Sequence, residues 1–115
     1  MSVTQNAVSV KDDILKKLNE CETHEQFSEV MPNLLGLLSY GKGFWAELGY
    51  CYKAVEIIDR AIYVLDDFTV GLDSLPTYKR VLKDGLTFLY SEWRKKLLVL
   101  RREYHTLHLQ GKTSS

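Results

Sequence analysis

The sequence predicts an all-α protein, a helical bundle of four to five helices built around two long ones. Apolar residues recur at steps of three and four along residues 44–68 and again along residues 76–108, which gives each segment one continuous apolar face. No stretch alternates apolar and polar residues convincingly with a period of two, so we predict no sheet. Because residues 69–75 form a short connection, we expect the two long helices to pack antiparallel.

Length and composition indicate one domain. The chain has 115 residues, of which 45% are apolar and 26% charged, and these values are typical of a globular domain with its own core. The formal net charge is zero, which disfavours electrostatic attraction to nucleic acid or anionic membranes as the main activity. No window is long and apolar enough to span a bilayer and no secretion signal is visible, so we expect a cytoplasmic or otherwise intracellular protein without a membrane partner.

A first short helix is expected near residues 10–21. Val10, Ile14 and Leu18 lie on one face at helical spacing, with lysines on the other face. Residues 1–8 are polar and lack this spacing, so we expect a disordered end.

A second short helix is expected near residues 24–40. Thr23 followed by Gln26 is a capping box, which marks the start of a helix. Pro32 lies within this segment, where proline removes a backbone hydrogen bond and clashes with the preceding turn. We therefore expect the helix to kink or restart at Pro32.

The two long helices follow. The apolar face of residues 44–68 contains Phe44, Leu48, Cys51, Val55, Ile58, Ile62 and Leu65. Pro76 suits the first turn of the last helix, which we expect over residues 76–108. Residues 110–115 are polar and are expected to be disordered. Cys21 and Cys51 lie on apolar faces without metal or redox spacing, so both are interpreted as buried free thiols.

Both long helices carry a second apolar strip. These strips contain Ile57, Val64 and Phe68 on the first long helix, and Val81, Phe88 and Leu98 on the second. A lone chain of this size can cover only part of them, so we expect a homo-oligomer, most simply a two-fold dimer. Gly85 lies inside the last helix, where glycine costs about 1 kcal/mol relative to alanine, and close approach of another helix would explain it. The alternative is a compact monomeric four-helix bundle.

Tyrosine and tryptophan are frequent among the residues that dominate protein interfaces. Tyr50, Tyr63 and Tyr90 do not fit the apolar stripes, and with Trp93 they are our candidate partner-binding residues. No catalytic set and no cofactor or metal site is apparent. The sequence therefore favours a non-enzymatic helical interaction module, such as an adaptor, assembly factor or inhibitor, that binds a protein partner or itself.

A basic cluster on the last helix suggests a second function. Arg94 and Arg101 lie seven positions apart and share a helix face, as do Lys95 and Arg102. Such a stripe could neutralise nucleic-acid phosphates. The other interpretation is that this basic helix pairs with the acidic remainder of the chain.

Two pairs of carboxylates suggest a third function. Glu22 and Glu25, and then Glu56 and Asp59, lie one helical turn apart, and convergent pairs of this kind can hold Mg²⁺. The pattern resembles that of the MazG-type nucleotide pyrophosphohydrolases, although the doubled glutamate of that family is missing here. The resemblance implies a Mg²⁺-dependent nucleotide hydrolase.

Overall fold

A computed structural model describes residues 3–47 and 51–113, and it describes side chains over residues 10–43, 45 and 51–110. In chain order the elements are α1 (Val3–Glu20), α2 (His24–Tyr40), α3 (Lys42–Glu47), α4 (Cys51–Gly71), the 3₁₀ turns η1 (Leu72–Ser74) and η2 (Thr77–Lys79), and α5 (Arg80–Thr113). No strand occurs in the described ranges, so the all-α prediction is confirmed. In these ranges, no helix combines the length and apolarity needed to cross a membrane.

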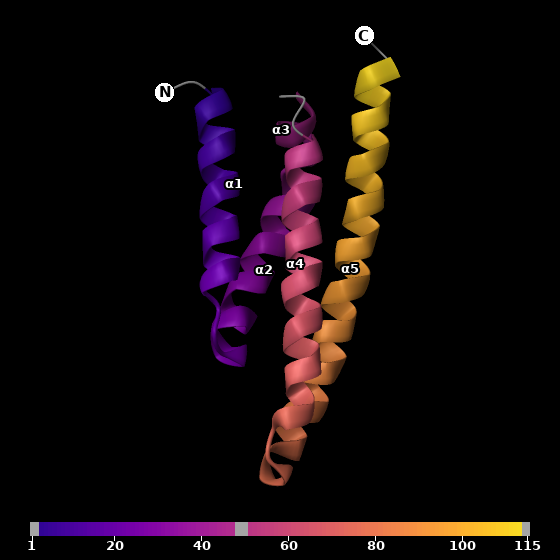
Figure 1. Cartoon of the computed structure of the whole chain (residues 1–115). Coiled ribbons are helices and arrows are strands. Elements are labelled where there is room, and N and C mark those ends of the chain that lie inside the picture. Colours follow the sequence, from indigo (N-terminus) through magenta and orange to yellow (C-terminus); the bar gives the residue numbers. More distant parts are fainter. Residues whose placement is uncertain (1–2, 48–50, 114–115) are drawn as a thin grey trace.

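The molecule is elongated, with extents of 56 × 28 × 18 Å. Figure 1 shows that α4 and α5 form a long hairpin. Helix α1 lies beside α4, and α2 crosses obliquely between α1 and α4. The end of the hairpin that contains η1 and η2 extends beyond α1 and α2. One part of α5 therefore lacks cover from the short helices.

Several helix boundaries differ from the sequence-based expectation. α1 begins at Val3 rather than near residue 10, because no glycine or proline interrupts the residues before it. α5 likewise continues to Thr113, beyond the expected end at residue 108. At its other end the regular helix begins at Arg80, because residues 77–79 form a 3₁₀ turn, as is common at helix termini.

The central helix also differs. We expected it over residues 44–68. The described elements of this segment are α3 (Lys42–Glu47) and α4, which continues to Gly71, while residues 48–50 of the expected helix lie outside the described residues. Gly41 separates α2 from α3, and its N–H donates to the Leu37 carbonyl at 2.9 Å. A Cβ atom at position 41 would overlap that carbonyl oxygen, which explains why glycine is needed there.

The start of α2 is as the sequence predicts. The Gln26 N–H donates to Thr23 Oγ1 at 3.1 Å, and the Thr23 N–H donates to Gln26 Oε1 at 3.3 Å, so the capping box is confirmed. The helix does not restart at Pro32, since α2 runs from His24 to Tyr40 with Pro32 exposed on its surface.

The core explains which apolar strips are covered within one chain. Ile57 and Val64 of α4 are buried, so the second strip of this helix is covered within one chain. α1 packs against α4 and contributes the buried Ile14 and Leu18, which accounts for the cover. The described buried residues are all apolar side chains or ring systems: Ile14, Leu18, Phe27, Met31, Leu34, Leu35, Leu38, Trp45, Cys51, Ala54, Ile57, Ile58, Ala61, Val64, Leu65, Leu72, Leu86, Tyr90, Trp93, Leu97, Leu100 and Tyr104.

Contacts between α4 and α5 fix their antiparallel register. Arg94 Nε lies 3.0 Å from Asp66 Oδ1, and Arg101 Nε lies 2.7 Å from Asp59 Oδ1. One further seven-residue step along each helix brings the rings of Tyr52 and His108 to within 6.4 Å. Falling residue numbers on α4 thus meet rising numbers on α5, and the predicted antiparallel packing is confirmed.

Candidate interaction surface

The structure separates the four aromatic residues that the sequence suggested as partner contacts. Tyr90 and Trp93 are only 1% and 6% exposed, so they belong to the core, and their suggested role at a partner surface is corrected. Tyr63 is 66% exposed, with the Arg60 guanidinium 4.9 Å from its ring centroid. Tyr50 lies outside the described residues. Of the four, Tyr63 is the one that the structure places on a described surface.

Tyr90 and Trp93 are part of an aromatic cluster between α2, α4 and α5. The ring centroid of Phe27 lies 4.7 Å from that of Phe68, 5.5 Å from that of Tyr90 and 6.0 Å from that of Trp93. His24, the first residue of α2, completes the cluster, with its Nδ1 2.8 Å from the Tyr90 hydroxyl. Burial raises the pKa of Tyr90 to about 12, so this hydroxyl stays protonated at physiological pH. The cluster joins the three helices and is structural.

His24 should make stability depend on pH. Burial lowers the pKa of His24 below its ordinary value of 6.5, so the unfolded chain binds a proton at a higher pH than the folded chain does. The free energy of unfolding should therefore fall as the pH drops through about 6.5 and level off below the folded-state pKa. Urea denaturation at pH 7.5 and 5.5 measures the difference. His24→Gln should remove this contribution.

His105 provides the control for the pH experiment. It is exposed on α5, so His105→Gln should keep the pH dependence of the unaltered chain. An identical pH dependence for His24→Gln and the unaltered chain would contradict the assignment to His24.

The basic residues of α5 are divided between two faces. On one face, Arg94 pairs with Asp66 of α4 and Arg101 pairs with Asp59 of α4. On the other face, Lys95 Nζ lies 3.3 Å from Glu92 Oε1 of the same helix. In the described part of the chain, the side chains of Lys96 and Arg102 make no ion pair. Pairing with acidic residues thus accounts for much of the charge that suggested a nucleic-acid contact.

The carboxylate pairs of the hydrolase alternative are not assembled into a cluster. Glu56 pairs with Lys11 of α1, and Asp59 pairs with Arg101 of α5, while Glu22 and Glu25 lie exposed around the start of α2. Among the described residues, no group of three histidine, cysteine, aspartate or glutamate side chains could hold a metal ion. Two of the four carboxylates are thus engaged in ion pairs with other helices.

An apolar strip on the outer face of α5 remains uncovered. Val81 is 87% exposed and Phe88 is 69% exposed, and Gly85 lies between them on the same helix face, because a helix turns about 100° per residue. Apart from its own chain neighbours and the nearby backbone of α5, no described atom lies within 4 Å of where a Gly85 Cβ would be, so no described packing contact explains this glycine. We call Val81, Gly85 and Phe88 the α5 strip. The exposed Tyr78 and Leu82 lie beside its first turn.

A groove continues from the α5 strip towards the C-terminus of α5. It lies between α2 and α5 and has a volume of about 450 Å³. One wall includes Gly36 of α2, where an added Cβ would meet open space. The other wall includes the exposed Val99 of α5. We call this space the α2–α5 groove; its lining residues are Leu35, Gly36, Ser39, Tyr40, Lys42, Glu92, Lys95, Lys96, Val99, Leu100 and Glu103.

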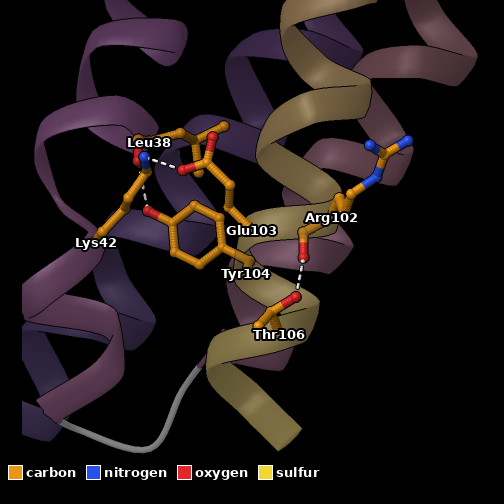
Figure 2. A network of polar contacts seen from close by, with 6 residues as sticks. All are labelled: Leu38, Lys42, Arg102, Glu103, Tyr104 and Thr106. Atoms are coloured by element: carbon orange, nitrogen blue, oxygen red, sulfur yellow. Dashed lines mark hydrogen bonds and ion pairs between the residues drawn. The ribbon is translucent and has the colours of Figure 1, made fainter. Parts of the chain in front are cut away.

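Polar contacts fix one end of the groove (Figure 2). The Lys42 ammonium pairs with the Glu103 carboxylate across the space between α3 and α5. Beside this pair, the buried Tyr104 hydroxyl donates to the Leu38 carbonyl of α2 at 2.5 Å. These contacts hold α2 against α5, so the groove has fixed walls at this end.

The α5 strip and the groove differ from the site that the sequence suggested. The sequence places Val81 and Phe88 in a second apolar strip, whereas the partner contacts that it suggests are tyrosine and tryptophan residues. The seven-residue spacing of Val81 and Phe88 around Gly85 was the available signal.

Comparison of the chain with protein-family models, curated proteins and solved structures found no match.

Proposed function

We propose that this chain is a non-enzymatic helical interaction module, an adaptor, assembly factor or inhibitor that binds a protein through the α5 strip. The observation that carries the proposal is the exposure of Val81 and Phe88 on one face of a regular helix. Their side chains are apolar, so burying them against another protein removes unfavourable contact with water.

The position of the α5 strip supports this use. It lies where α5 extends past the cover of α1 and α2 (Figure 1), so a partner can approach without displacing a helix of the chain. Gly85 at its centre lets the backbone of an approaching helix come close, which offsets the cost of glycine in a helix interior. Helices that dock an apolar face into a partner use contacts at this spacing.

A photoreactive residue on the α5 strip tests the proposal. We expect Phe88→benzoylphenylalanine to form a covalent adduct of one defined mass with its partner, both in the purified protein and in an extract of the cells that make it. An adduct of twice the chain mass identifies a second copy, and any other mass identifies a different protein. Adding Val81→Asp should suppress the adduct, because it places a charge in the apolar contact.

Thr87 provides the matched control position. It is exposed on the same helix but faces away from the α5 strip, so Thr87→benzoylphenylalanine should form little or none of this adduct. Equal adducts from both positions, or no adduct from residue 88 in either setting, would overturn the proposed function.

A further inference from the structure

We propose that the partner of the α5 strip is a second copy of this chain, bound antiparallel so that Phe88 of each copy packs beside Val99 of the other. The inference rests on the proposed function and specifies its partner. In this arrangement the α5 strip of each copy covers the α2–α5 groove of the other, which makes the contact two-fold and self-complementary.

The α5 strip and the groove lie on one continuous face of α5. Helical spacing places Val81, Gly85, Phe88, Glu92 and Val99 within a narrow arc of that helix. A straight partner helix lying along α5 can therefore contact the strip and the groove together. The second α5 helix of a dimer has the required length, since α5 spans Arg80–Thr113.

Charge along this face changes sign near its middle. Asp84 and Glu92 lie on the side of the α5 strip, whereas Lys95, Lys96 and Arg102 lie on the side towards the C-terminus. The acidic Glu103 also lies on that side, where its charge is paired with Lys42 of the same chain. Two copies aligned antiparallel bring the acidic half of each against the basic half of the other. A parallel alignment would bring like charges together, so the pattern selects the antiparallel arrangement.

One register satisfies the central charges and the apolar residues. It also sets Asp84 opposite Glu103 of the second copy, whose charge is compensated by Lys42. Phe88 precedes Glu92 by four positions, and Val99 follows Lys95 by four positions. An antiparallel alignment that places Glu92 opposite Lys95 of the second copy therefore also places Phe88 opposite its Val99. The same alignment brings Gly85 opposite Arg102, where the absent Cβ leaves room for the guanidinium.

The groove has groups that such a partner would use. Glu92 and Lys95 already form a pair within the chain, and the second copy would extend it to a network of four charges. Lys96, which makes no ion pair among the described residues, lines the same groove. Gly36 leaves space on the α2 wall, so the Phe88 ring of the second copy can enter beside Val99.

Charge reversal tests the register. Glu92→Lys and Lys95→Glu should each raise the dimer dissociation constant at least about tenfold, because each places like charges opposite one another. Mixing the two variants should restore association, since every altered residue then faces an opposite charge in the other chain. Sedimentation equilibrium at low salt measures both effects. Asp67→Lys and Lys16→Glu, which make the same charge changes at exposed sites on α4 and α1, should leave the dissociation constant unchanged.

Disulfide trapping tests the orientation. Chains with Gly85→Cys and chains with Arg102→Cys, both in a Cys21→Ser background, should form a cross-linked heterodimer when mixed and oxidised. Gly85→Cys alone should not cross-link, because the two copies of residue 85 lie far apart in an antiparallel pair. Cross-linking of Gly85→Cys alone would overturn the antiparallel arrangement.

The outcomes distinguish this inference from the proposed function. A monomeric unaltered chain, or a dimer unaffected by the reversals at positions 92 and 95, would overturn the inference of an antiparallel second copy. In either case the adduct formed from residue 88 still decides whether the α5 strip binds a protein. Absence of that adduct would overturn both the proposed function and the inference of a second copy.

Discussion

Phe27→Ala should lower the free energy of unfolding by about 3–5 kcal/mol, the usual cost of removing a fully buried aromatic ring. Phe27 is completely buried at the centre of the aromatic cluster, and its ring contacts those of Phe68, Tyr90 and Trp93. These residues come from α4 and α5, so the cavity would weaken the attachment of α2 to the hairpin. Urea denaturation followed by circular dichroism measures the loss.

Phe88→Ala is the matched control for this change. It removes the same atoms from a ring that is mostly exposed, so at concentrations where the chain is monomeric its effect should stay within about 0.5 kcal/mol. A loss below about 1 kcal/mol for Phe27→Ala would show that the cluster does not hold α2 in place.

Tyr104→Phe should lower the free energy of unfolding by about 1–3 kcal/mol, the cost of leaving a buried polar group without its partner. The Leu38 carbonyl lies in the last turn of α2, where carbonyl groups lack the regular partners of a helix interior. The Tyr104 hydroxyl donates to it at 2.5 Å (Figure 2). Burial raises the pKa of Tyr104 well above its ordinary value, so the hydroxyl keeps its proton and remains a donor.

Tyr78→Phe controls for the loss of a hydroxyl. Tyr78 is largely exposed in the η2 turn, so its replacement should change the free energy of unfolding by no more than about 0.5 kcal/mol. Equal stability of Tyr104→Phe and the unaltered chain in urea denaturation would mean that another group satisfies the Leu38 carbonyl.

The fold could be predicted because its signals are local. Helical spacing identified the buried faces of α4 and α5, and the capping residues Thr23 and Gln26 identified the start of α2. The antiparallel packing follows from a short connection. Its register was not predicted, because the pairing of Asp66 with Arg94 and of Asp59 with Arg101 depends on how far the turn advances each helix. The boundaries of α1 and α5 could not be predicted as well, because apolar spacing marks the buried face of a helix and does not mark where its polar end stops.

The surface could not be predicted as well, because exposure depends on which helix covers which face. Val64 and Phe88 belong to equivalent second strips in the sequence, yet Val64 is buried and Phe88 is exposed. The difference arises because α1 packs on α4, whereas the short helices do not reach the first turns of α5. Tyr90 lies off the expected stripe of α5 but is buried, because α2 crosses that helix and widens its covered arc.

The register of the long hairpin also bears on the order of folding. Its ion pairs join residues 28 positions apart for Asp66 and Arg94, and 42 positions apart for Asp59 and Arg101. Closing the shorter loop costs less chain entropy, so we expect the hairpin to form from its turn towards its open end, before α1 docks. Pulse-labelling hydrogen exchange should then show amide protection near Asp66 earlier than protection in α1.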